Sequence, residues 1–494
     1  MILAITLSKL LIGVAIAAAV LTAGVGVLKS QKNWLMTYLQ NFCGALFIFS
    51  GWVKAVDPLG TAYKMEQYFG EFTSTFEGTW MSFIAPIFPW LSNYATGFSV
   101  FMIVFEIVLG IMLILGIRSK LTSWLFLGLV AFFTFLTGFT YLTGYVPADV
   151  NFFSFGSWGP YVETNMKVTD CGCFGDFLKL KPKVSFFKDV FLMFPALYFV
   201  FKHKDMHQLL NAKVRTGILG LSALGLLVYC LSNFVWDLPG KDFRPFKKGV
   251  DVAGTLKAEK EAAGNVQVTS YILTNKASGK VTELPYADFM KKYKDYPKED
   301  WEYEQVKSKP TIEATKISDF VLEDVDGNEM TEAVLSDPKY SFMIVSHKLK
   351  YKEAYDKIMV NDTTFVSETI TNEDTTYVVQ KVASVSQREA KETRYVWDVD
   401  FQKDYQEKIN PLAEAAEKDG FNVYAIVGGA GPATIDEFRH ATQTAFPFYM
   451  ADDILLKTIV RSNPGVVMLK NGVIIDKWHI NKLPAYAEMK SLMK

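Results

Sequence analysis

The pattern of apolar and polar residues changes near the middle of the chain. Up to residue 236 the chain consists mainly of long apolar runs, whereas from residue 237 onward Lys, Glu and Asp separate short, alternating apolar stretches. The change falls within LSNFVWDLPGKDFRPF (231–246), where two prolines and a glycine follow an apolar run. Turn-forming residues at such a change of pattern are typical of a domain boundary.

Apolar runs in the first half are long enough to cross a membrane, which takes about 20 mostly apolar residues. They cover residues 2–28, 36–56, 97–116, 121–143, 186–201 and 215–236. In the first run Lys9 precedes small apolar residues, as in a signal peptide, but we expect a retained helix. The pattern therefore predicts an α-helical transmembrane bundle of about six helices over residues 1–236.

Basic residues in the loops predict the orientation of this bundle. The short loops on one side carry Lys29, Lys32, Arg118, Lys120, Lys202, Lys204, Lys213 and Arg215. The opposite loops, 57–96 and 144–185, are longer and have Lys at lower density. Because cytoplasmic loops are enriched in Lys and Arg, we expect the long loops and everything after residue 236 to face outward. The net charge of −1 gives no indication of an electrostatic partner such as nucleic acid. The apolar runs indicate a lipid bilayer as the surrounding medium.

Two of the four cysteines lie one residue apart in TDCGCFGD (169–176), within an outward loop. Outside a bacterial cytoplasm, paired cysteines persist as disulfides. A bridge between such close residues is strained and easily reduced, which suits a transfer disulfide better than a structural one. Two unreactive thiols in a turn remain the alternative, and no further ligand completes a metal site. Cys43 and Cys230 fall at different depths of their helices, so we expect no bridge between them. Cys43 is expected to be a small buried residue, and a third thiol within reach of the cysteine loop is the alternative role for Cys230.

Two ionisable residues fall inside predicted membrane helices. Glu106 lies in the middle of FMIVFEIVLG, and Lys54 lies near the outer end of the preceding helix, which ends at Asp57-Pro58. An ionisable group at membrane depth is a candidate functional residue. Lys54 and Glu106 either form a structural ion pair that locks two helices or handle a proton or a polar headgroup. Glycines on the same two runs, including Gly44 and Gly110, predict close helix packing.

The end of the polar half follows a regular order of strands and helices. The predicted elements are a strand at 340–346, a strand at 421–429, a helix at 432–442, a strand at 446–452, a helix at 453–460 and a hairpin at 462–479. The hairpin turns at Asn471-Gly472. This order, with Pro464 just before the hairpin, resembles a periplasmic thioredoxin-like domain, and the resemblance implies that Pro464 is cis.

The resemblance breaks where the redox chemistry of such domains resides. The Cys-x-x-Cys pair would fall near residues 346–349, yet no cysteine follows Cys230, so the domain is predicted to be redox-inactive. His347 is interpreted as an exposed histidine without a role. Residues 237–335 are predicted to be a linker with a β-containing insertion that turns at Ser278-Gly279, and 359–398 are predicted to add another hairpin.

Three motifs of the first half resemble the DoxX/MauE-like membrane family, named for methylamine utilisation. They are NFCGALFIFSGWVKAVDPLGTAYKMEQYF (41–69), FEIVLGIMLILG (105–116) and DCGCFGDFLKL (170–180), the last followed by FFKDV. The resemblance implies a helical bundle, as in envelope members that append a thioredoxin-like tail. Related methylamine-utilisation proteins are associated with maturing a disulfide-rich partner, and other DoxX proteins with a quinone-linked oxidoreductase. The resemblance marks Cys171 and Cys173 as the redox pair, and it marks Lys54, Asp57 and Glu106 as polar members of the bundle.

We therefore expect a multi-domain protein with a DoxX/MauE-like bundle (1–236), a linker and β insertion (237–335) and an α/β thioredoxin-like periplasmic domain (336–494). Its expected function is redox maturation, folding or export of envelope proteins at the bacterial inner membrane, by thiol–disulfide exchange at Cys171 and Cys173. The alternatives are a non-catalytic subunit of an envelope complex and a quinone-linked oxidoreductase subunit. The partners are a client protein or complex subunits, quinone is the one cofactor considered, and no metal is expected. Candidate binding residues are Lys54, Asp57, Glu106, Asp170, Asp176 and Pro464.

Overall fold

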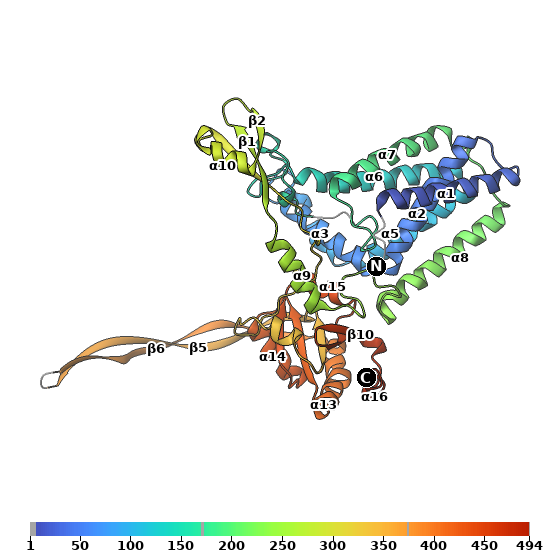
Figure 1. The fold of residues 1–494 in the computed structure, drawn as a ribbon. Coiled ribbons are helices and arrows are strands. Elements are labelled where there is room, and N and C mark those ends of the chain that lie inside the picture. Colours follow the sequence, from blue (N-terminus) through green and yellow to red (C-terminus); the bar gives the residue numbers. More distant parts are fainter. Residues whose placement is uncertain (1–5, 169–171, 373–374, 494) are drawn as a thin grey trace. The chain divides into compact units, whose positions relative to one another are not determined.

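The computed structural model describes residues 6–168, 172–372 and 375–493. The chain divides into two compact units, Met1–Lys247 and Lys248–Lys494, called here the membrane unit and the tail unit. Figure 1 colours the membrane unit from blue to green and the tail unit from yellow-green to red. Each unit is described by itself below.

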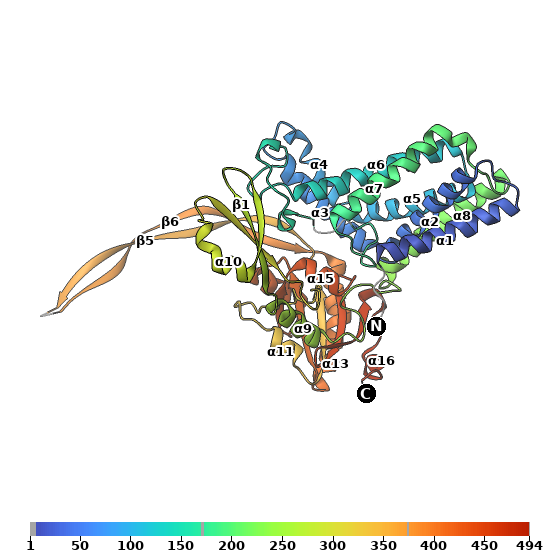
Figure 2. The same ribbon diagram turned by 45° about the horizontal axis from the view of Figure 1, so that its top comes forward.

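Six helices of the described membrane unit are long and apolar enough to cross a membrane, which confirms the predicted number. They are α1 (Leu7–Val27), α2 (Trp34–Val56), α5 (Ala95–Leu115), α6 (Ser119–Thr143), α7 (Pro182–Lys202) and α8 (Ala212–Leu231). Side chains of Thr6, Asn33 and Asn211 accept backbone hydrogen bonds at the starts of α1, α2 and α8, which explains where these helices begin. In Figures 1 and 2, α6 runs beside α7, and α2 runs beside α5.

Helices α2 and α5 approach each other along glycines, as the sequence predicted. A Cβ atom on Gly44 would lie 2.9 Å from the carbonyl oxygen of Gly110, and one on Gly110 would lie 2.8 Å from that of Gly44. Neither position therefore has room for a side chain. Small residues of this kind allow membrane helices to pack backbone to backbone.

The outward segment 57–96, expected to be a loop, contains a full helix. It forms α3 (Pro58–Phe76), the 3₁₀ turn η1 (Ser82–Ile84) and the short helix α4 (Ile87–Ser92). Asp57 caps α3, since its carboxylate accepts a hydrogen bond from the Gly60 N–H at 3.2 Å, and Pro58 occupies the first turn. The prediction missed α3 because this segment is too polar to resemble a membrane span. Smaller turns of the unit are η2 (Phe155–Ser157), η3 (Glu163–Asn165), η4 (His203–Asp205) and the π-helical η5 (Ser232–Trp236).

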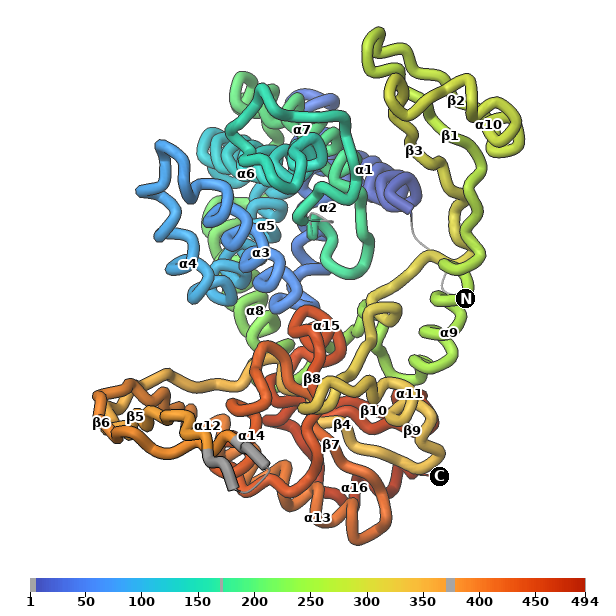
Figure 3. Tube along the Cα trace, turned by 90° about the vertical axis from the view of Figure 1, so that its left-hand side faces the viewer, coloured from blue at the N-terminus to red at the C-terminus, as the bar shows by residue number. Residues whose placement is uncertain are grey.

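The tail unit contains a five-stranded sheet in the order β10-β9-β4-β7-β8. Its strands are β4 (Tyr340–Ser346), β7 (Asn422–Gly428), β8 (Phe448–Ala451), β9 (Gly465–Lys470) and β10 (Val473–His479). Strands β4, β7 and β8 are parallel, whereas β9 and β10 form an antiparallel hairpin, and Figure 3 shows β4 between β7 and β9. All of the strands and the hairpin predicted after residue 340 are present. The hairpin turns at Asn471 and Gly472, both with positive φ, as the Asn-Gly pair requires.

Helices and aromatic side chains cover the sheet of the tail unit. The helices are α9 (Val252–Gly264), α11 (Thr331–Leu335), α12 (Val399–Lys403), α13 (Asn410–Lys418), α14 (Pro432–Thr442), α15 (Asp453–Ile459) and α16 (Tyr486–Lys490), with the π-helical η7 (Asp404–Ile409) and the turn η8 (Ile480–Lys482). Phe342, Tyr405 and Phe438 lie at the centre of the core, each fully buried. The predicted helices at 432–442 and 453–460 are confirmed as α14 and α15.

Two further β structures occur in the tail unit. A small sheet, β2-β1-β3, consists of β1 (Val268–Asn275), β2 (Val281–Pro285) and β3 (Trp301–Lys307), with α10 (Tyr286–Lys292) and η6 (Tyr293–Asp295) beside it. Its first hairpin confirms the turn predicted at Ser278-Gly279. The second is a two-stranded hairpin, β5 (Tyr351–Asn372) and β6 (Thr375–Trp397), which projects from the five-stranded sheet as a long arm (Figures 1 and 2). This arm starts eight residues earlier than the hairpin predicted at 359–398.

Candidate functional site

A cavity of about 90 Å³ lies among the helices of the membrane unit. Side chains from α2, α3, α5, α6 and α7 line it, together with residues 172–174 of the loop that precedes α7. Most of the wall is apolar. Its polar members are Ser50, Lys54, Thr61, Lys64, Glu106, Thr137, Cys173, Lys188 and Asp189.

The first ion pair at this cavity joins Lys54 and Glu106, the two ionisable residues predicted inside membrane helices. Lys54 Nζ lies 2.5 Å from Glu106 Oε2, and the two side chains are only 6% and 3% exposed. The Lys54 ammonium also lies 5.1 Å from the ring centroid of Phe133 on α6, where a cation is attracted to the ring face. The expected pairing of the two helices is therefore present, and both charges face the cavity.

A second ion pair at the cavity, Lys188 with Asp189, was not predicted. Lys188 Nζ lies 2.5 Å from Asp189 Oδ1, and the other carboxylate oxygen accepts a hydrogen bond from Thr137 Oγ1 at 3.1 Å. Asp189 is thus bound to α6 as well as to its own helix. The signal was available in VSFFKDVFLMF, where two ionisable residues interrupt an apolar run as Glu106 does.

Cys173 brings a free thiol to the wall of the same cavity. Its backbone carbonyl accepts a hydrogen bond from Ser50 Oγ at 2.9 Å, which attaches the loop to α2. Gly172 and Gly175 adopt positive φ on either side, so the loop turns sharply at the cysteine. Burial raises the pKa of the Cys173 thiol, Lys188 opposes this most strongly, and Asp189 reinforces it.

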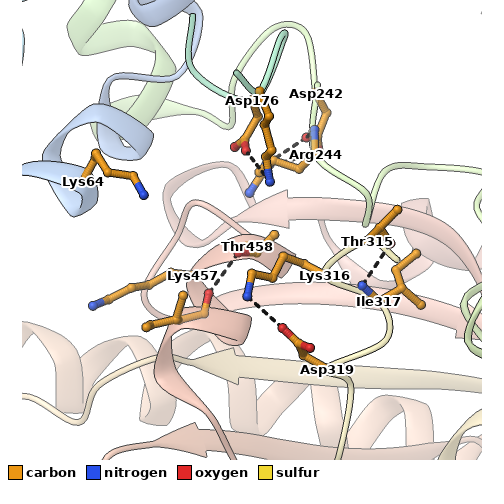
Figure 4. A network of polar contacts seen from close by, with 12 residues as sticks. Lys64, Asp176, Asp242, Arg244, Thr315, Lys316, Ile317, Asp319, Lys457 and Thr458 are labelled. Atoms are coloured by element: carbon orange, nitrogen blue, oxygen red, sulfur yellow. Dashed lines mark hydrogen bonds and ion pairs between the residues drawn. The ribbon is translucent and has the colours of Figure 1, made fainter. Parts of the chain in front are cut away.

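The other candidate residues of the cysteine loop are Asp170, Cys171 and Asp176. Cys171 and Asp170 lie outside the described residues. Asp176 forms an ion pair with Lys179 at 3.5 Å, and Figure 4 shows it beside Arg244 and Asp242, whose Nε and Oδ1 atoms are 2.8 Å apart. The contact between the Phe177 and Phe243 rings, with centroids 5.3 Å apart, joins the same two segments. Asp176 therefore lies at a junction of loops, and Asp57 lies at a helix start.

Cys43 and Cys230 lie in separate apolar clusters. Cys43 packs in the core with Leu46 and Phe47, and Cys230 packs with Ile103 and Ile107 of α5. Both are fully buried. Their separate surroundings agree with the expectation that they do not pair.

Pro464 belongs to the tail unit and follows a cis peptide bond, as predicted. Its neighbour Asn463 donates a hydrogen bond from Nδ2 to the carbonyl oxygen of Lys348 at 2.8 Å, so the Pro464 loop contacts residues 346–349. His347, expected to be exposed, is instead partly buried, and burial lowers its pKa to about 4. Figure 4 also shows Lys316 and Asp319 of this unit, with Nζ and Oδ2 2.7 Å apart. Within the described residues, no group of three or more His, Cys, Asp or Glu side chains is arranged to hold a metal ion.

One comparison with known proteins gives a match. Residues 32–148 match the family model of methylamine utilisation protein MauE. The matched segment holds Lys54, Asp57 and Glu106, whereas Cys173 and the Lys188–Asp189 pair lie beyond it. The searches of curated proteins and of solved structures found no match. The six apolar helices support a membrane-embedded protein, and the segment similar to the MauE model extends from α2 to α6.

Proposed function

We propose that this chain is a bacterial inner-membrane protein that supports redox maturation of envelope proteins by thiol–disulfide exchange at Cys171 and Cys173. The observation that carries the proposal is the position of the Cys173 thiol at a buried cavity whose wall holds two ion pairs. Two lysine ammonium groups at this wall favour a thiolate, which is the reactive form of cysteine. The match to a methylamine utilisation protein model supports a membrane accessory role.

The proposed exchange transfers two electrons from a client protein to the loop. A client thiolate attacks the Cys171–Cys173 disulfide, forms a mixed disulfide with one cysteine and releases the other as a thiolate. The second client thiolate then displaces the loop cysteine, which leaves a client disulfide and two reduced loop cysteines. Protons lost by the client thiols reach the two loop thiolates through solvent.

Reoxidation of the loop requires a two-electron acceptor, for which we propose a membrane quinone. The donor set of the cavity fits such a headgroup, because the Lys54 and Lys188 ammonium groups are hydrogen-bond donors and the Phe133 ring belongs to an apolar wall. When bound, a quinone would accept two electrons and two protons. Lys54 and Lys188 would hold its carbonyl oxygens, and the surrounding apolar side chains would exclude water.

The tail unit is proposed to be a thioredoxin-like docking module on the periplasmic side. Its strand order, with parallel strands in the centre followed by an antiparallel hairpin, supports this assignment. The segment 346–349 beside Pro464 is the position of the cysteine pair in redox-active members, and here it reads Ser-His-Lys-Leu. The proposed role is therefore to hold a client or partner while the membrane unit exchanges disulfides.

Replacement of the loop cysteines tests the redox proposal. We expect Cys171→Ser and Cys173→Ser each to abolish client oxidation, and one of them to accumulate a mixed disulfide that alkylation traps and mass spectrometry identifies. Cys43→Ser is the matched control, since Cys43 is buried among apolar residues, and it should leave oxidation unchanged. Normal oxidation of envelope proteins in the Cys171→Ser/Cys173→Ser double variant would overturn the proposal.

The arm formed by β5 and β6 favours a second candidate, a non-catalytic subunit of an envelope complex. An isolated two-stranded ribbon is marginally stable in water, yet this one exposes a set of large apolar side chains. The set comprises Tyr355, Met359, Phe365, Val366, Val378, Val382, Val385 and Val396. If assembly alone is the function, partners should co-purify with the double cysteine variant and be lost when residues 356–392 are replaced by a short turn.

A further inference from the structure

Lys188 brings its positive charge to the part of the cavity wall that holds Cys173. The side chain of Lys188 is 13% exposed, and its Nζ lies 5.8 Å from the ring centroid of Phe174, the residue next to the cysteine. Lys188 and Cys173 both line the cavity. The ammonium group therefore acts on the sulfur in a region where little water screens the charge.

The position of Lys188 is restrained from two helices. Asp189 Oδ1 binds the ammonium at 2.5 Å, and Asp189 Oδ2 is bound by Thr137 of α6 at 3.1 Å. The carboxylate cannot turn toward the cysteine loop without breaking one of these contacts. This arrangement keeps the cation near the loop, with one carboxylate oxygen of Asp189 bound to Lys188 and the other to Thr137.

Charged and polar groups surround the Cys173 thiol on several elements. Burial raises the pKa of Cys173. Lys188 is the strongest of the groups that lower it, and Lys54 and the Ser185 side chain lower it less. Asp189 acts in the opposite direction. The other charged groups here are Glu106, bound to Lys54; Lys64, whose Cγ lies 3.2 Å from the position of a Cβ on Gly172; and Asp176 and Lys179 on the cysteine loop.

We propose that Lys188 is a positioning residue that increases the fraction of Cys173 present as the reactive thiolate, against the opposing effect of burial. A buried thiol without a nearby cation stays protonated, and a protonated thiol does not exchange disulfides. The biological purpose of this thiolate, disulfide exchange with a client, rests on the proposed function. The inference concerns only the equilibrium between thiol and thiolate at Cys173, in which the released proton enters the solvent.

The rate at which Cys173 is alkylated, measured against pH, tests the inference. The full chain is purified in detergent and reduced, Cys171→Ser is present throughout, and mass spectrometry follows the peptide that carries Cys173 during reaction with iodoacetamide. We expect Lys188→Met to slow alkylation at neutral pH about tenfold or more, because loss of a nearby cation raises a thiol pKa by at least about one unit. Lys188→Arg should retain most of the rate.

Asp189→Asn should change the alkylation rate of Cys173 in the opposite direction to Lys188→Met. Removal of the carboxylate leaves the cation and removes a repulsive charge, so alkylation should become faster than in the parent chain. A purely structural ion pair predicts the same change for both variants, since either one breaks it. Lys183→Met is the matched control, because Lys183 is an exposed residue on the same helix, and it should leave the pH profile unchanged.

An unchanged pH profile in a folded Lys188→Met variant would overturn the inference, with folding judged by gel filtration and thermal melting. If that variant does not fold, Asp189→Asn decides, since an unchanged or slower rate would contradict the proposed role. The proposed function fails separately, through normal client oxidation in the double cysteine variant. Alkylation is measured without a client, so the two results are independent.

Discussion

Four ionisable side chains of the membrane unit, three buried and Lys188 partly buried, form two neighbouring ion pairs at one cavity. Lys54 and Glu106 join α2 to α5, whereas Lys188 and Asp189 are adjacent on α7 and are joined to α6 through Thr137. Transfer of a single charge from water into such a place costs several kcal/mol unless a counterion is present. Each residue of a pair therefore offsets the free-energy cost of burying the charge of its partner, whatever further role the pair has.

Removal of one member of the Lys54–Glu106 pair should destabilise the membrane unit more than removal of both. Lys54→Met alone leaves Glu106 buried without its counterion, which costs about 3–5 kcal/mol, whereas Lys54→Met/Glu106→Gln leaves no uncompensated charge. Thermal unfolding of the detergent-purified chain should give a much lower melting temperature for the single variant than for the double variant. Equal loss in the single and double variants would show that the charges are not coupled in the folded protein.

Helix packing in the membrane unit depends on contacts that specific residues make possible. Gly44 and Gly110 allow α2 and α5 to meet at their backbones, and this close approach places Lys54 opposite Glu106. The loop before α7 is attached to α2 by the hydrogen bond from Ser50 to the Cys173 carbonyl. The cavity is thus built from elements far apart in the sequence, and a change in the α2–α5 spacing should alter the site as well as the stability.

Gly110→Ala should lower the melting temperature of the membrane unit, because the new Cβ would lie 2.8 Å from the Gly44 carbonyl oxygen and 2.8 Å from Ile48 Cγ1. Overpacking of this kind typically costs about 1–3 kcal/mol. Gly128→Ala is the matched control on α6, since a Cβ there would meet nothing within 4 Å. A loss of stability at Gly128 equal to that at Gly110 would contradict the explanation by close packing.

The basic loops of the membrane unit contact one another, which bears on how the whole molecule lies in a bilayer. Lys32 Nζ donates to the carbonyl oxygen of Lys204 at 3.1 Å, and Arg215 Nη1 donates to that of Gly116 at 3.0 Å. Loops between α1 and α2, α5 and α6, and α7 and α8 therefore gather at one end of the bundle. The sequence assigned these same loops to a single side from their charge alone.

Local features of the sequence predicted most of the elements, whereas contacts between distant segments were not predictable from it. The six apolar helices and the β9–β10 hairpin follow from length, hydropathy and the Asn-Gly turn, which are properties of short segments. Two ionisable residues in the apolar run of α7 were a local signal for the second ion pair, but the contacts of Asp189 with Thr137 and of Lys188 with Phe174 form only on folding. For the same reason the sequence suggested a site at Lys54 and Glu106 but not the cavity that they share with Cys173.

Enrichment of Lys and Arg in cytoplasmic loops predicts that the tail unit lies outside the cytoplasm. If the six apolar helices of the described residues all cross the membrane, their even number and the common end of the basic loops predict that the cysteine loop and the tail lie on the side opposite the basic loops. Protease added to intact spheroplasts should therefore digest the tail unit and leave the loop at residues 203–211 protected until the cells are lysed. Fragments mapped by mass spectrometry distinguish the two loops within one experiment. Protection of the tail in intact spheroplasts, with cleavage at 203–211, would show the reverse orientation. Cys173 would then lie in a reducing compartment, where client disulfides do not persist and the proposed exchange could not operate.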